Sequence, residues 1–163
     1  MSAAKKTQLF TETTEVPVER SLAEITGLLI RAGACAINTN FAPGGKVESV
    51  SFVLPYGAGR IPYLLPARVD PVFKKLNGQR SRWGRFPQHE MVAKDREQAE
   101  RVAWRQLFWW LKSQLALIEL GMVESAEVLL PYMLGHDGRS FFDTYKPRML
   151  AAPKEEEAHA HPS

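Results

Sequence analysis

The side chains best suited to chemistry lie between Arg80 and Phe86, in the stretch RSRWGRF. Binding to nucleic acid needs cations for the phosphates and flat rings on which bases can stack. This stretch interleaves three arginines with two aromatic rings around a glycine, so it supplies both. Two lysines come before it, in a predicted helix from which they should point outward while Val72, Phe73 and Leu76 pack. The predicted nucleic-acid-binding residues are Lys74, Lys75, Arg80, Arg82, Trp83, Arg85 and Phe86.

Positive charge is concentrated around this stretch. The 163-residue chain carries a net charge of +3. Between Arg60 and Glu90 there are seven basic and two acidic residues, a net charge of +5, which leaves −2 for the rest of the chain. Such a concentration points to an acidic partner, here DNA or RNA. An equal alternative is that Trp83 and Phe86 enter the core while the arginines only face water.

Patterns typical of enzymes and metal sites are weak. His89 and Glu90 do not begin an HExxH zinc motif, because position 93 is alanine. His136 and Asp137 lie in a glycine-flanked turn, where aspartate is expected for backbone reasons. The two histidines near the C-terminus have no further ligands beside them. We therefore expect a non-catalytic protein with no cofactor and no metal.

The single cysteine, Cys35, excludes an intrachain disulfide and fits a reducing compartment. It is expected to be a buried, inert thiol on an apolar strand face. No apolar run is long enough to span a bilayer, and the N-terminus lacks the apolar core of a signal peptide. The expected location is the cytoplasm, without contact to a membrane.

These candidate residues need a scaffold, and its longest element is a helix predicted from Asp95 to Gly121. Asp95 and Gln98 fit a capping box, and Gly121 suits the left-handed residue after the last turn. Arg105 and Lys112 belong to the stripe that should face water. The stripe predicted to be buried has spacings of three and four residues and comprises Trp104, Leu107, Leu111, Leu115, Ile118 and Met122.

Three aromatic residues on this helix suggest a second function. Phe108 widens the apolar stripe, and we expect Trp109 and Trp110 to pack under neighbouring elements. Alternatively, Trp109 is an exposed anchor for a partner. The chain would then be a protein-interaction module, either a homo-oligomer or an inhibitor of a host protein, with Phe108, Trp109 and Trp110 as its interface.

The remaining pattern predicts an α+β fold. An N-terminal helix, a three-stranded antiparallel meander, a long amphipathic helix and a short C-terminal helix should pack on one sheet face. Cys35, Ile37, Thr39 and Phe41 are expected on the buried face. The other face should carry Asn38, Asn40, Ser49, Ser51 and Arg60. The predicted helices are 17–33, 68–77, 95–121 and 124–130, the strands are 35–41, 47–54 and 60–65, and 78–90 is a loop.

We expect one domain over residues 17–150, a flexible N-terminal arm over 1–16 and a disordered acidic tail over 151–163. Phe141, Phe142 and Tyr145 should pack back onto the domain. The helix–strand–strand–strand–helix order resembles that of a double-stranded RNA-binding domain, in order only.

Three strings resemble small uncharacterised proteins encoded by phages and prophages. They are VPVERSLAEITGLLIRAGA, FVLPYGAGRIPYLLPARVDPVF and ERVAWRQLFWWLKSQLALIELGMVESAEVLLPY, and the similarity covers about residues 16–133. The resemblance implies a genomic setting and no catalytic residues. In that setting, a small basic protein is expected to assist DNA replication, recombination or defence evasion.

Overall fold

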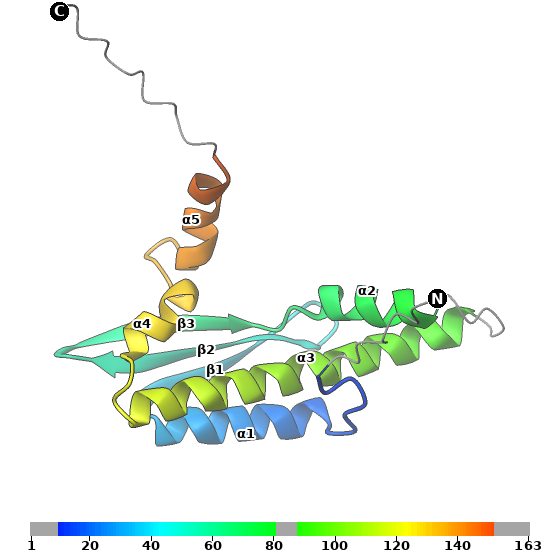
Figure 1. Cartoon of the computed structure of the whole chain (residues 1–163), viewed down its shortest axis with the longest axis horizontal. Helices are drawn as coiled ribbons and strands as arrows, with labels where there is room; N and C mark the ends of the chain where they lie inside the picture. The colour runs from blue at the N-terminus through cyan, green and yellow to red at the C-terminus, as the bar shows by residue number, and fades with distance from the viewer. Residues whose placement is uncertain (1–9, 81–87, 152–163) are drawn as a thin grey trace, which may run out of the picture.

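The computed structural model describes residues 10–80 and 88–151, with side chains described for 10–77 and 95–151. It confirms the α+β prediction (Figure 1). Each element takes the label used in the figures. In chain order the elements are α1 (Val18–Arg31), β1 (Ala36–Phe41), β2 (Val47–Tyr56), β3 (Gly59–Pro66), α2 (Val69–Arg80), α3 (Gln88–Glu119), α4 (Ser125–Leu129), the 3-10 turn η2 (Leu130–Tyr132) and α5 (Phe141–Leu150).

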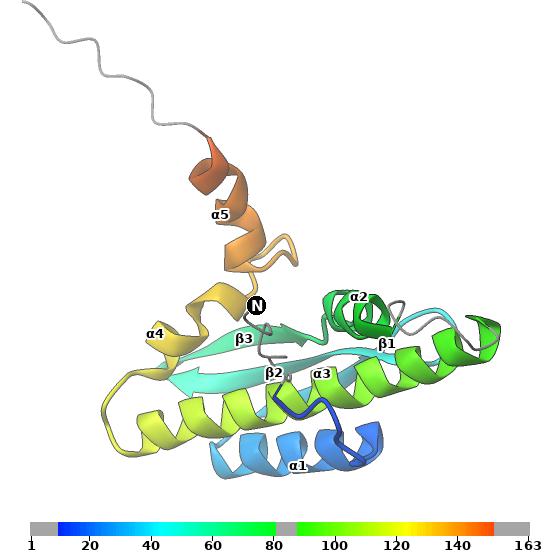
Figure 2. The ribbon, with the colours of Figure 1, turned by 45° about the vertical axis from the view of Figure 1, so that its right-hand side comes forward.

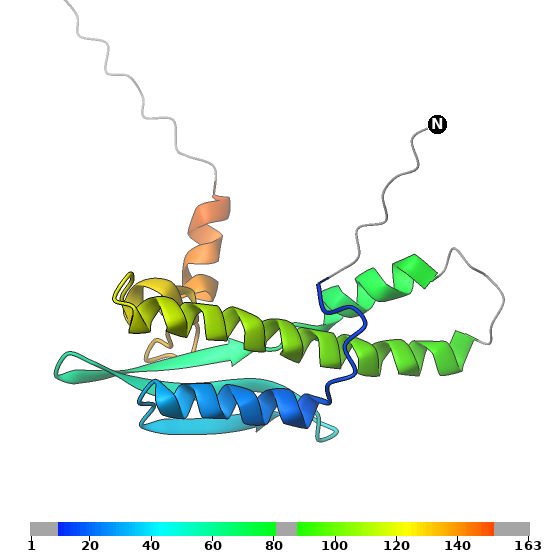
Figure 3. The ribbon, with the colours of Figure 1, turned by 60° about the horizontal axis from the view of Figure 1, so that its bottom comes forward.

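The three strands form the predicted antiparallel meander in the order β1-β2-β3. Helices α1 and α3 lie side by side on one face of this sheet and run in the same direction (Figures 1 and 3). The side chains of Phe52 and Tyr63 are paired across β2 and β3, and their rings stack with centroids 5.4 Å apart. The core between helices and sheet comprises chiefly Ile25, Leu29, Val50, Phe52, Leu54, Tyr63, Leu65, Trp104, Phe108, Leu111 and Leu115.

The predicted polar face of the sheet is also present. Asn40 is paired with Ser49 in the register, and Asn38 is paired with Ser51. The Asn40 side-chain amide donates hydrogen bonds to the hydroxyl of Ser49 at 3.0 Å and to that of Ser51 at 3.4 Å. Asn40, Ser49 and Ser51 are therefore hydrogen-bonded through the Asn40 amide on the face that α1 and α3 leave free.

Strand β1 is less buried than its sequence pattern predicts. Cys35, Thr39 and Phe41 were expected in the core, but all three are exposed, and Phe41 is 61% exposed. Only Ile37 of this set packs against the core cluster, whose buried strand residues all lie on β2 and β3. Alternation predicts which side chains share a face, but it does not predict whether a helix covers that face. The expectation of a buried Cys35 is therefore wrong.

Helix α3 begins at Gln88, seven residues before the predicted start, and spans 32 residues. Asp95 is buried inside the helix, so the predicted capping box with Gln98 is wrong. Ala99 and Ala103 are buried in the N-terminal half of α3, and α2 packs against this helix. Alanine adds little apolar periodicity although it allows two helices to approach closely.

The C-terminal end of α3 agrees with the prediction. Gly121 has φ +68°, and its N–H donates to the carbonyl of Ile118. The N–H of Met122 donates to the carbonyl of Leu117 at 3.0 Å, which completes a Schellman motif. Because the chain turns away here, Met122 is 67% exposed, and its predicted place in the buried stripe is wrong.

Helices α2 and α3 form an antiparallel pair that extends past the end of the sheet (Figures 1 and 3). The predicted loop over 78–90 is wrong at both ends, since residues 78–80 belong to α2 and residues 88–90 to α3. The part between them, residues 81–87, lies outside the described residues.

The chain after α3 covers one sheet edge and then leaves the body. The N–H of Leu134 donates to the carbonyl of Pro62 in β3 at 2.9 Å, and Met133 bridges to Tyr63. Helix α5 then projects away from the sheet (Figure 2), and none of its residues is buried. The expected packing of residues 141–150 is limited to their start: Phe141 and Phe142 are half-buried and Tyr145 is exposed.

At the N-terminus, residues 10–16 of the predicted arm lie along α3. The side-chain amide of Gln98 donates to the carbonyls of Glu12 at 2.9 Å and Thr14 at 3.0 Å, and that of Gln106 donates to the carbonyl of Phe10. Across the described ranges, no helix combines the length and apolar content needed to cross a bilayer.

Candidate nucleic-acid interface

Helix α2 determines where the two predicted lysines point. It starts soon after β3, with Asp70 in its first turn. Leu76 is buried and Phe73 is half-buried, so the face of α2 that contains these two side chains packs against α3. Lys74 and Lys75 lie on the opposite side and are exposed, as the helical spacing requires. Both ammonium groups are therefore accessible to a ligand.

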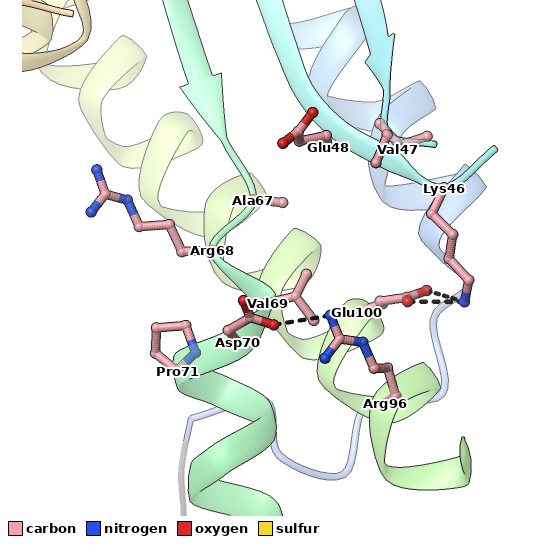
Figure 4. A pocket seen from close by; sticks show the side chains of 11 residues that line it. Lys46, Val47, Glu48, Ala67, Arg68, Val69, Asp70, Pro71, Arg96 and Glu100 are labelled. Carbon is pink, nitrogen blue, oxygen red and sulfur yellow. Dashed lines mark hydrogen bonds and ion pairs between the residues drawn. The ribbon is translucent and has the colours of Figure 1, made fainter. Parts of the chain in front are cut away.

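Two ion pairs lie at the base of the α2–α3 pair: one joins α2 to α3, and the other joins the β1–β2 turn to α3 (Figure 4). A guanidinium nitrogen of Arg96 lies 2.9 Å from a carboxylate oxygen of Asp70, and the guanidinium sits 5.4 Å from the ring centroid of Phe73. The ammonium of Lys46 lies 2.9 Å from both carboxylate oxygens of Glu100. Each cation here already has an anionic partner.

A groove of about 370 Å³ lies between these pairs, where the β1–β2 turn, the end of β3, α2 and α3 meet (Figure 4). Its lining balances three basic side chains against three acidic ones. Without a net charge, the groove does not by itself attract an anion. The charged residues that line it are Lys46, Glu48, Arg68, Asp70, Arg96 and Glu100.

Arg68 differs from the other two cations of the groove. Its side chain points away from both ion pairs in Figure 4, and its guanidinium lies 5.9 Å from the ring centroid of Phe142. Within the described part of the chain, neither Arg68 nor Lys74 nor Lys75 has an ion pair with a carboxylate. The uncompensated positive charge therefore continues from Arg68 along α2.

The other predicted binding residues follow directly on this helix. Arg80 is the last residue of α2, and its side chain is not among those described. Arg82, Trp83, Arg85 and Phe86 lie outside the described residues. The structure thus assigns Lys74 and Lys75 to an exposed helix face and leaves the central RSRWGRF prediction untested.

The three aromatic residues of the alternative interface have different environments. Phe108 is buried in the core, and Trp110 is half-buried with its ring centroid 5.2 Å from that of Tyr132. Trp109 is 38% exposed, and the Lys112 ammonium lies 5.1 Å from its ring centroid. Of these three side chains, only Trp109 offers substantial surface to a partner.

One charged contact was missed by the sequence analysis. Arg105 was expected on the water-facing stripe, but its side chain is only 13% exposed and donates a hydrogen bond to the Glu24 carboxylate on α1. Its guanidinium also lies 4.2 Å from the ring centroid of Phe108. This hydrogen bond from Arg105 holds the pKa of Glu24 below its usual value. No local spacing relates two residues so far apart in the sequence.

The weak catalytic pattern at His136 and Asp137 has a structural explanation. The Asp137 carboxylate accepts a hydrogen bond from the Arg139 N–H at 3.1 Å, which is the expected backbone role of aspartate in a turn. Among the described residues, no group of three or more His, Cys, Asp or Glu side chains could hold a metal ion.

Comparison of the chain with protein-family models, with curated proteins and with solved structures gives no match. The resemblance to phage-encoded proteins therefore stays a prediction, and the likeness to double-stranded RNA-binding domains stays one of element order.

Proposed function

We propose that this chain is a non-catalytic accessory protein that binds nucleic acid through the basic aromatic stretch RSRWGRF and the adjoining helix α2, with little preference for sequence. One observation carries the proposal: residues 74–89 contain five lysines and arginines and not one aspartate or glutamate. Phosphate groups are bound by such concentrations of cations. The proposed contacts are those of Lys74, Lys75, Arg80, Arg82 and Arg85, with bases stacked on Trp83 and Phe86.

The arrangement of the helices supports this proposal. Helix α2 ends and α3 begins at the same end of the molecule, beyond the sheet (Figure 3). Lys74 and Lys75 are exposed on the side of α2 that faces away from α3. A long polyanion can approach such an end without meeting the sheet or α5.

The groove at the base of the helical pair has equal numbers of basic and acidic side chains, in contrast to the basic segment that begins at Lys74. Lys46 and Arg96 are neutralised by Glu100 and Asp70, so they add little to the attraction of a phosphate backbone. The surplus positive charge is therefore on α2 and in the segment that follows it. Contacts between basic side chains and phosphates do not read base edges, so we expect only a slight preference for sequence.

The test is fluorescence anisotropy with labelled single- and double-stranded DNA and RNA at several salt concentrations. The triple variant Arg80→Ala/Arg82→Ala/Arg85→Ala should bind more weakly than wild type. For a duplex, the slope of log affinity against log salt concentration should be smaller in this variant by roughly 2 to 3. Each phosphate contact made by the wild type releases about 0.9 counterions, and the variant loses three such contacts. Trp83→Ala should weaken binding to single strands by about 1–3 kcal/mol through the lost stacking.

The matched control is Arg31→Ala/Arg60→Ala/Arg148→Ala, which removes the same charge from three exposed positions elsewhere. Equal losses in both triple variants would mean that only net charge matters and would contradict the assigned site. Wild-type protein that binds none of the four nucleic acids at low salt would exclude the function itself.

A second candidate is a protein-interaction module, because Trp109 exposes an aromatic ring beside Lys112 on the outer side of α3. Exposed tryptophans often anchor protein interfaces. Self-association that Trp109→Ala abolishes, measured by light scattering, would favour this candidate.

In a phage or prophage setting, either function would operate in the cytoplasm, in DNA replication, recombination or defence evasion.

A further inference from the structure

Strand β1 lies at one edge of the sheet and is paired only with β2. On its outer side, no strand or other paired backbone is found among the described residues. We infer that β1 is where two copies of this chain join, edge to edge, into one continuous antiparallel sheet. This inference is independent of the proposed binding to nucleic acid and uses a different surface.

The two sheet edges are treated differently, and the contrast points to β1. The β3 edge contains Pro62 and Pro66, and the carbonyl of Pro62 already accepts a hydrogen bond from the Leu134 N–H. Prolines and covering segments are the usual protection of an edge strand against pairing. Strand β1, with the sequence AINTNF, has neither a proline nor a charged residue. Within the described ranges of the chain, no segment pairs with its outer edge.

Several side chains of β1 are also exposed to solvent, including a large apolar one. Phe41 is 61% exposed, and Ala36 and Thr39 are exposed as well. The apolar pair of Ile37 and Phe41 lies on the side of the sheet that α1 and α3 cover elsewhere. A strand added at this edge would bury part of the exposed apolar surface beside it.

Charge and symmetry favour a second copy of the same strand as the occupant. Antiparallel strands related by a two-fold axis place a residue opposite itself and its neighbours opposite each other in reverse order. With the axis at Thr39, Ile37 lies opposite the partner's Phe41, so an apolar side chain meets an apolar one. Because β1 is uncharged, no like charges meet in this register. The same lack of cations makes β1 a poor surface for nucleic acid.

Sedimentation equilibrium over a wide concentration range tests the inference. The wild type should form a reversible dimer. Thr39→Lys should raise the dissociation constant at least about tenfold, because the new charge would lie opposite its own copy. Thr39 is exposed, so the substitution leaves the core intact, which circular dichroism can verify. The control is Ala58→Lys, which adds the same charge at an exposed position in the β2–β3 turn.

A cysteine experiment tests the register separately. In a Cys35→Ser background, Thr39→Cys should form a disulfide between two chains under mild oxidation, because directly opposed strand residues come close enough for one. Ala58→Cys in the same background should not. A wild type that stays monomeric at every concentration would overturn the inference. A dimer that Thr39→Lys leaves intact, or that Thr39→Cys fails to cross-link, would overturn it as well.

Discussion

The contact between Arg105 and Glu24 shows how one charged side chain can join two helices of the core layer. Arg105 lies between the Glu24 carboxylate and the Phe108 ring, so it neutralises a charge and covers an aromatic surface at once. Glu24 is 31% exposed and also accepts a hydrogen bond from Arg20 at 3.3 Å. Water still reaches this carboxylate, so the contribution of the pair to stability is modest.

This contact predicts a dependence of stability on pH. Because Arg105 lowers the pKa of Glu24 from its usual 4.5, folding favours the ionised carboxylate. That stabilisation is complete above pH 4.5 and is lost as the pH falls through the lower pKa of the folded state. Glu24→Gln should therefore reduce the free energy of unfolding by about 1 kcal/mol at neutral pH, and by much less in acid.

Urea unfolding at neutral and acidic pH measures this difference. Glu97→Gln is a suitable control, because Glu97 is an exposed residue of α3. If Glu24→Gln and Glu97→Gln were equally stable at neutral pH, the pair would contribute nothing. A loss for Glu24→Gln that persisted unchanged in acid would have a cause other than the ionised carboxylate.

At the scale of elements, two glycines show how backbone conformation defines the helices. Gly27 lies within α1, whereas Gly121 ends α3 with φ +68°. A Cβ atom added at either position would meet nothing within 4 Å. The two sites therefore differ in backbone conformation and not in space. Only Gly121 adopts the left-handed region that other residues avoid.

The two alanine substitutions should consequently have opposite effects. Gly27→Ala should stabilise the protein by about 0.5–1 kcal/mol, because alanine loses less backbone entropy in a helix. Gly121→Ala should destabilise it by about 1 kcal/mol, because alanine is strained at a positive φ. Chemical denaturation of the two variants gives both values. Effects of the same sign would contradict the assigned conformations.

At the scale of the whole molecule, most of the stabilising core is formed by α1, α3 and the sheet, with Leu129 of α4 added to it. Buried residues such as Trp104 and Leu111 lie there, whereas none of the ten residues of α5 is buried. Helix α5 projects from the body in two different views (Figures 1 and 2). The elements that stabilise the fold are therefore distinct from α5.

A truncation tests this division. Removing residues 144–163 should change the free energy of unfolding by less than about 1 kcal/mol, because this part of α5 buries little surface. Trp104→Ala should cost about 3–5 kcal/mol, since it removes a fully buried ring. Urea titrations of both proteins provide the comparison. A truncated chain as unstable as the Trp104 variant would mean that α5 packs on the core.

The sequence by itself determined the features that depend on neighbours along the chain. Alternation predicted the three strands and their shared faces, and helical spacing placed Trp104, Leu111 and Leu115 in the core. Glycine predicted the end of α3 at Gly121. Within the candidate interface, the spacing around Leu76 was enough to place Lys74 and Lys75 on the exposed side of α2. All of these follow from local backbone geometry.

Only the tertiary structure decided what covers each surface. It paired Arg105 with Glu24, which are 81 residues apart, and packed α2 against an α3 that begins at Gln88. It also left Phe41 exposed on an edge strand whose alternation resembles that of a buried one. The period of a segment reports its own geometry, whereas burial depends on which distant segment packs against it, and that is set by the assembled fold.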